Sequence, residues 1–169
     1  KPKREEEFQA FKDMAASLGA EAASPIPVSD ASYLEDKIYE QRYAFDSKKL
    51  NEYFEISAVQ QGIMDIASRL FGVSFGRSDA PVWHSDVQAF DVNDANGPIG
   101  RIYLDLYPRD NKYKHAAVFG LRDTSRRADG TRELPFAALV CNFPKPGTSP
   151  ALLSHDDVTT FFHEFGHLL

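Results

Sequence analysis

Two histidines and one glutamate within the last seven residues of the chain have the types and spacing of a metal site. His163, Glu164 and His167 form the pattern H-E-x-x-H. On a helix, residues i and i+4 lie on the same face, so both imidazoles can reach one ion. Imidazole nitrogen is a common ligand of zinc, and a neighbouring glutamate can act as general base toward water. A catalytic zinc ion takes three protein ligands, and the pattern supplies two of them.

The segment that carries this pattern has the features of a helix with two different faces. Ser154 is a suitable N-cap, and Asp157 stands three residues later, as in a capping box. At about 100° per residue, His163 and His167 fall roughly opposite a set of apolar side chains, namely Val158, Phe161, Phe162, Phe165, Leu168 and Leu169. The sequence therefore predicts a helix that packs through its apolar face and presents the two histidines on the other.

Helical periodicity also occupies most of the first half of the chain. Apolar residues recur at helical spacing in residues 5–18, which end at Gly19, and a second helix is expected from about Asp30. Between these helices, residues 20–29 hold two prolines and small side chains, which is typical of a linker. A short helix is expected at 48–54, and Ser57 is a candidate N-cap for a further helix that Gly72 ends.

The second half of the chain changes to the period of β-strands. Residues 87–92 and 99–107 flank a turn sequence at 94–98, which predicts a β-hairpin. The polar stretch 109–130 is expected to be a long loop that could hold a short strand at 117–121. Residues 136–143 are apolar on both sides, as in a strand covered on both faces. The predicted fold class is α+β: a helical segment at 1–75, then a small, mostly antiparallel sheet and the H-E-x-x-H helix at 76–169.

Composition and charge narrow the classes of partner. The 169 residues carry a net charge of −6 with a pI near 5.3, which does not favour binding to nucleic acid or to an anionic membrane surface. No apolar run approaches the roughly 20 residues of a membrane span, and the start of the chain has no signal-peptide pattern. Cys141 is the only cysteine, so no intrachain disulfide forms, which agrees with a cytoplasmic location. Its apolar strand predicts a buried thiol.

Other polar residues have structural explanations that we prefer to metal binding. The remaining histidines lie in a loop, in the long polar stretch and at the start of the last helix: His84, His115 and His155. Asp156 shares the histidine face but is two turns away, which favours interaction with the helix dipole. Asp105 and Arg109 could form an ion pair that orients a nearby loop, or an ordinary pair at the edge of a strand.

The last helix and four upstream segments together resemble peptidase family M3, the zinc metallopeptidases that include thimet oligopeptidase, oligopeptidase A and the peptidyl-dipeptidases. Residues 161–167, F-F-H-E-F-G-H, resemble the zinc helix of that family. Further matches are W-H-S-D-V at 83–87, G-R-I-Y-L-D-L-Y-P-R at 100–109 followed by Lys112, L-V-C-N-F at 139–143 and L-S-H-D-D-V at 153–158. The likeness extends over most of residues 30–169 and is far more specific than the pentapeptide alone.

The resemblance implies a largely helical zinc peptidase, with a small sheet beside the active site, that hydrolyses short oligopeptides. By position, His163 and His167 would ligate Zn²⁺, and Glu164 would activate water and then protonate the leaving amine. The family takes its third ligand from a glutamate on the following helix, which lies outside residues 1–169. The chain is therefore expected to be an N-terminal part of a catalytic domain, inactive by itself. Oligopeptidase and dipeptidyl carboxypeptidase activity both stay open, and the substrate-binding residues are unknown.

A second hypothesis treats the chain as a non-catalytic α+β domain. In that case the H-E-x-x-H helix serves packing or partner binding, and its histidines have no chemical role. Phe161, Phe165 and Leu168 would then be exposed when no further chain covers them, and the domain would self-associate through this apolar surface. A glutamate on a helix after Leu169 would separate the two hypotheses in favour of the metal site.

Overall fold

The structure of the chain is a computed structural model that describes residues 2–19, 25–43 and 47–169. Part of the predicted linker, residues 20–24, lies outside the described residues. The chain divides into two compact units, Lys1–Leu50 and Asn51–Leu169, which we describe separately. The predicted boundary near residue 75 falls inside the second unit.

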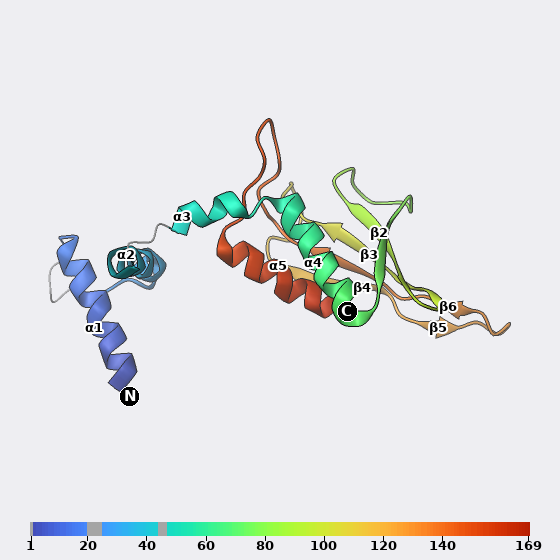
Figure 1. The fold of residues 1–169 in the computed structure, drawn as a ribbon, viewed down its shortest axis with the longest axis horizontal. Helices are drawn as coiled ribbons and strands as arrows, with labels where there is room; N and C mark the ends of the chain where they lie inside the picture. The colour runs from blue at the N-terminus through green and yellow to red at the C-terminus, as the bar shows by residue number, and fades with distance from the viewer. Residues whose placement is uncertain (1, 20–24, 44–46) are drawn as a thin grey trace. The chain divides into compact units, whose positions relative to one another are not determined.

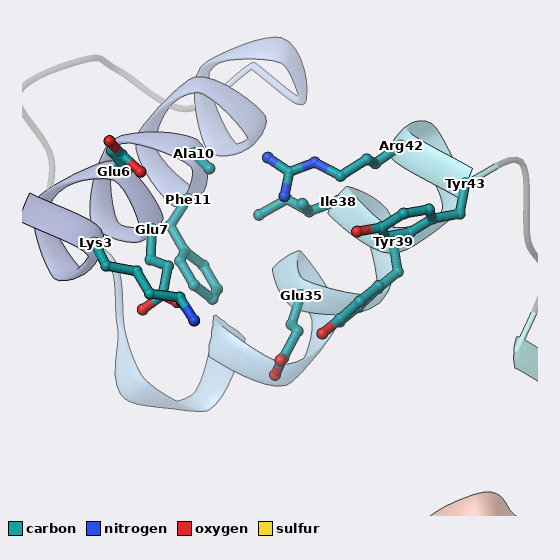
Figure 2. A pocket seen from close by; sticks show the side chains of 10 residues that line it. All are labelled: Lys3, Glu6, Glu7, Ala10, Phe11, Glu35, Ile38, Tyr39, Arg42 and Tyr43. Carbon is teal, nitrogen blue, oxygen red and sulfur yellow. The ribbon is translucent and has the colours of Figure 1, made fainter.

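The first unit is helical, as its periodicity predicts. Its elements are α1 (Pro2–Ser17), a 3-10 turn η1 (Val28–Asp30), α2 (Ala31–Tyr43) and α3 (Ser47–Leu50). α1 and α2 pack against each other, with Met14 and Leu34 buried, and α1 is followed by Gly19 at a positive φ of 93°. Figure 2 shows Phe11 of α1 and Ile38, Tyr39 and Arg42 of α2 around a hollow between these two helices. Both helices therefore bury only a narrow apolar stripe.

The second unit begins with a short 3-10 turn, η2 (Asn51–Tyr53), and α4 (Ile56–Phe71). The predicted N-cap Ser57 is wrong, because the cap is Glu55, whose carboxylate accepts a hydrogen bond of 2.9 Å from the Ala58 N–H. Glu55 is held extended by a β-bridge to Leu152, so the helix begins directly after it. Gly72 ends α4 in the left-handed conformation, as predicted.

A five-stranded mixed sheet forms the centre of the second unit. Its strands, in spatial order, are β1 (Ser74–Ser78), β2 (Gln88–Asp94), β3 (Gly97–Asp105), β7 (Phe136–Val140) and β4 (Ala117–Arg122). Every neighbouring pair is antiparallel except β3 and β7, which confirms the mostly antiparallel prediction. A two-stranded ribbon of β5 (Ser125–Arg126) and β6 (Arg132–Glu133) projects beyond the sheet (Figure 1). Neither β1 nor this ribbon is predicted from the sequence.

The predicted hairpin and the predicted covered strand are both present. β2 and β3 form the hairpin, and Gly97 takes a φ of 121° at the turn, a region that favours glycine. β7 has Ala138, Leu139 and Val140 all buried, so both of its faces are covered. Beyond Val140, the Cys141 N–H still donates to the Asp105 carbonyl at 2.9 Å. The short strand that the sequence allowed at 117–121 is present as β4, and it forms one edge of the sheet.

One face of the sheet carries α4 and the last helix, α5 (His155–Leu168), side by side (Figure 1). Between helices and sheet lies the main core, whose fully buried large side chains are Ile56, Leu104, Leu106, Leu139, Leu153 and Phe161. The other face, which we call the far face, holds a second, smaller cluster of Val87, Ala89, Tyr103 and Ala138. Within the described ranges, no helix combines the length and apolar character needed to cross a lipid bilayer.

Candidate metal centre

The start of α5 is fixed by a reciprocal cap. The Ser154 hydroxyl accepts a hydrogen bond of 3.1 Å from the Asp157 N–H, and the Asp157 carboxylate accepts one of 3.0 Å from the Ser154 N–H. This is the predicted capping box, and it satisfies two backbone donors that helix geometry leaves unpaired. The histidines therefore lie on a helix with a defined first turn.

Aromatic contacts with the sheet set the rotation of α5 about its axis. Phe161 and Phe165 are buried, and the Phe165 ring lies 5.8 Å from that of Phe75 on β1. Phe162 was predicted on the same face, but it is 41% exposed, because the sheet covers a narrower arc of the helix than the apolar residues span. The second hypothesis expects Phe161 and Phe165 to be exposed, which is wrong, since the sheet covers both. Self-association of the chain stays a prediction.

His163 and His167 lie on the exposed side of α5, and their rings approach each other. Their Nε2 atoms are 3.1 Å apart, and the ring planes meet at 84°. Two nitrogens at about 2.0–2.1 Å from one tetrahedral zinc ion would be about 3.3 Å apart. The pair therefore fits two adjacent ligand positions around a single zinc ion, and both residues are exposed.

Glu164 lies between the two histidines in sequence, is half-buried, and is close enough to Cys141, the residue after β7, to affect its thiol. Burial raises the pKa of the Cys141 thiol to about 12, and the negative charge of Glu164 adds to this rise. The thiol is thus neutral near pH 7, and it is fully buried, as is typical of a structural cysteine. The predicted small buried cysteine is confirmed, and the effect of Glu164 shows that its carboxylate is close to the sheet.

No third ligand joins the histidine pair among the residues that the structure describes. Within those ranges, no three His, Cys, Asp or Glu side chains come close enough to hold a metal ion together. The histidines outside the motif have other neighbours. His84 accepts a hydrogen bond from the Asp86 N–H, the His115 ring contacts Tyr113, and the His155 ring contacts Phe54. This arrangement agrees with the structural explanations given for them above.

Asp105 is the centre of a buried charged cluster on the far face of the sheet. Arg109 donates to both carboxylate oxygens at 2.6 and 2.7 Å, Trp83 donates at 2.9 Å, and Lys112 lies 2.9 Å away. Burial raises the pKa of Asp105, but the hydrogen bonds from Arg109, Lys112 and Trp83 outweigh it and lower that pKa to about 2. The sequence left two alternatives for Asp105 and Arg109, and the structure shows the ion pair that orients a loop. The loop is the segment between β1 and β2, which Trp83 attaches to the pair through its hydrogen bond to Asp105.

Lys112 is the supporting residue whose role the sequence analysis did not predict. Its ammonium is buried and donates to the carbonyl oxygens of Asp105 at 2.8 Å, Tyr107 at 2.6 Å and Cys141 at 2.5 Å. Burial lowers the pKa of Lys112, and the hydrogen bond to Asp105 opposes that change. The only signal in the sequence is its place just after the segment 100–109. Its effect is to tie the ends of β3 and β7 together.

Comparison with known proteins identifies the family. The model of peptidase family M3 matches residues 1–169, the whole chain. The chain belongs to peptidase family M3. Its M3 relatives include thimet-like oligopeptidase of Dictyostelium discoideum, 41% identical over 83% of this chain and 22% of the relative. Saccharolysin of Saccharomyces cerevisiae is 37% identical over 98% of this chain and 25% of the relative. Oligopeptidase A of Escherichia coli is 36% identical over 99% of this chain and 25% of the relative.

The chain spans about a quarter of the length of these M3 relatives. The family match confirms the resemblance that five sequence segments indicated, at the level of the family. The predicted α+β class is confirmed by the helices and the small mixed sheet. The roles of His163, Glu164 and His167 stay predictions, which their geometry supports.

Proposed function

We propose that the chain is part of a zinc-dependent metallopeptidase that hydrolyses peptide bonds in short oligopeptides. The observation that carries the proposal is the 3.1 Å separation of the His163 and His167 Nε2 atoms on a helix that also bears Glu164. His163 and His167 hold the zinc ion, and a third ligand comes from outside the described residues. When bound, zinc supplies Lewis acidity, which polarises a carbonyl group and lowers the pKa of water.

Glu164 moves the proton in this mechanism. One of its carboxylate oxygens takes a proton from the water molecule as the water oxygen attacks the carbonyl carbon of the scissile bond. The same carboxyl group then gives that proton to the amine nitrogen as the carbon–nitrogen bond breaks. Glu164 is half-buried, and its charge acts on the Cys141 thiol at the end of β7, which supports a position of the carboxylate between the solvent and the sheet.

The free edge of β4 is the proposed binding site for the peptide backbone. β4 contacts α5, and among the described strands only β7 pairs with it. Its other edge therefore presents unpaired N–H and C=O groups close to the histidine helix. An extended peptide adds to such an edge through main-chain hydrogen bonds, which suits many sequences. Short peptides as substrates also agree with the names of the oligopeptidase relatives.

Two further parts of the proposal concern the chain as a whole. Residues 1–169 form an N-terminal part of the catalytic domain and are inactive without the third zinc ligand, since two imidazoles bind zinc weakly. The protein acts in the cytoplasm, in agreement with a single cysteine that is buried and unpaired. Cleavage from the carboxyl end in dipeptide steps is an alternative to endopeptidase cleavage of the same substrates.

Metal removal tests the proposal. The full-length protein that carries this chain is assayed on a quenched fluorescent peptide of about ten residues before and after treatment with a chelator. We expect cleavage to stop and to return when zinc is added. His163→Ala removes a ligand and lowers both zinc content and activity, whereas the control His155→Ala, at an exposed histidine of the same helix, leaves both unchanged. Cleavage that persists after zinc removal would contradict the proposal.

A further inference from the structure

The side chains of β4 alternate between the two faces of the sheet from Ala117 to Gly120, after which the pairing with β7 shifts register before Arg122. Val118 packs into the main core on the side of α4 and α5. Its neighbour Phe119 pairs with Ala138, which belongs to the far-face cluster. A peptide added to the free edge of β4 alternates in the same way, so every second side chain reaches the far face.

The far face has a hollow of about 330 Å³ beside β4, which we call the aromatic hollow. Its apolar walls are Trp83, Tyr113, Phe119 and Leu121, and their exposed fractions run from 42% to 51%. The rings of Tyr113 and Phe119 meet edge to face at 87°, with centroids 5.6 Å apart. Large apolar side chains gathered at one exposed place indicate a binding surface.

The charged groups at the base of the aromatic hollow are already paired. Asp105 and Lys112 line the base, and both are buried. Asp105 accepts hydrogen bonds from Trp83 and Arg109, and Lys112 contacts Asp105 and three carbonyl oxygens. The base therefore presents no buried charge that lacks a partner. An uncharged, apolar side chain is the occupant that such a lining favours.

The geometry points to the aromatic hollow as a specificity subsite for the far-face side chains of a peptide bound along β4. This inference rests on the proposed function and adds a substrate preference to it. Phe119 belongs to the regularly paired part of β4, so a side chain opposite it on the added strand becomes its cross-strand neighbour. Leu121 lies at the register shift of β4 and adds an apolar wall to the hollow. Aromatic and large aliphatic residues are then favoured at every second position of the substrate, and the positions between them show no such preference.

A positional scan tests the inference. One phenylalanine is moved residue by residue through an otherwise alanine- and glycine-based quenched peptide, and kcat/KM of the full-length protein is measured for each position. We expect a preference with a period of two, about three- to tenfold between alternate positions, as for an aromatic pair. A preference without this alternation overturns the inference, as does the absence of any preference.

Substitutions at the wall of the hollow connect that preference to Phe119. Phe119→Ala should bring the ratio between alternate positions close to one, while Phe71→Ala, at an exposed phenylalanine on α4, should leave the ratio unchanged. Leu121→Asp should transfer the preference to lysine and arginine at the same positions, because it adds a carboxylate to the wall. A periodic preference that persists in both wall variants overturns the inference.

The outcomes also separate this inference from the proposed function. Peptides that are not cleaved can be tested for binding to the full-length Glu164→Gln variant by fluorescence anisotropy, which needs no turnover. Chelator-sensitive cleavage without a period of two keeps the zinc peptidase and rejects the subsite. No chelator-sensitive cleavage of any peptide rejects the proposed function, and the subsite is rejected with it.

Discussion

The ring of Phe161 lies 5.3 Å from that of Phe143, centroid to centroid, at an interplanar angle of 44°. This contact fixes which side of α5 meets the sheet. Phe161 has no exposed surface, and the next residue, Phe162, is 41% exposed. The packing of one phenylalanine thus decides that the two histidines face outward, where a metal ion and a peptide can reach them.

Adjacent phenylalanines on α5 should differ greatly in their effect on stability. Phe161→Ala leaves a cavity in the main core and should lower the free energy of unfolding by about 3–5 kcal/mol. Phe162→Ala removes a side chain from the outer side of the helix and should cost less than about 1 kcal/mol. Urea unfolding of the chain, followed by the fluorescence of its only tryptophan, Trp83, measures both. Equal losses of stability in the two variants would contradict the rotation of α5 in which Phe161 is buried and Phe162 is exposed.

The main features of α5 could be predicted from the sequence because they are local. The Ser154 cap and the spacing of the histidines depend on residues within a few positions of one another. The width of the buried face could not be predicted, because it depends on strands that are distant in sequence. Phe162 is therefore the residue of α5 for which the helical period alone gave the wrong side.

Acid should destabilise the chain through Asp105. Burial raises its pKa, but hydrogen bonds from Arg109, Lys112 and Trp83 lower it from 3.8 to about 2 in the folded state. A carboxyl group whose folded pKa is depressed stabilises the fold above its unfolded pKa. This stabilisation, about 2 kcal/mol, is lost as the pH falls from about 4 to about 2. Urea midpoints measured across this range should show the loss.

Substitution separates Asp105 from the other carboxylates that titrate in acid. Asp105→Asn leaves Lys112 and Arg109 without their charged partner and should lower the free energy of unfolding at pH 7 by about 3–5 kcal/mol. The matched control is Asp91→Asn, which removes a cross-strand pair with Arg101 whose two side chains are 41% and 25% exposed, and which should cost less than about 1 kcal/mol. A wild-type acid response in Asp105→Asn would contradict this assignment.

Two serines near helix starts should respond differently to removal of their hydroxyl groups. Ser154→Ala breaks the capping box of α5 and should cost about 1 kcal/mol. Ser57→Ala should change stability by less than about 0.5 kcal/mol, because Glu55 caps α4. Urea midpoints of the two variants give the comparison. A larger loss of stability in Ser57→Ala than in Ser154→Ala would show that Ser57 caps α4, as the sequence suggested.

The features that the sequence did not reveal depend on distant backbone. Glu55 caps α4 because the neighbouring backbone pairs with residues 151–153: Ile56 N–H donates to the Ala151 carbonyl, and Leu153 N–H donates to the Phe54 carbonyl. β1 is short, contains Gly76 and, among the described strands, pairs only with β2 at an edge, so its five residues show no clear strand pattern. The Lys112 ammonium is buried where it donates a hydrogen bond to the carbonyl of Cys141, a residue 29 positions later in the sequence.

The Glu164→Gln substitution in the full-length protein tests the central claim most directly, with zinc content and kcat/KM measured on the same samples. Because we propose that Glu164 moves a proton and holds no metal, we predict that kcat/KM falls at least about 100-fold while zinc stays at one ion per chain. Glu52→Gln, the same change at an exposed site on η2, should leave both quantities unchanged. Retained cleavage in Glu164→Gln, or loss of its zinc, would contradict the account.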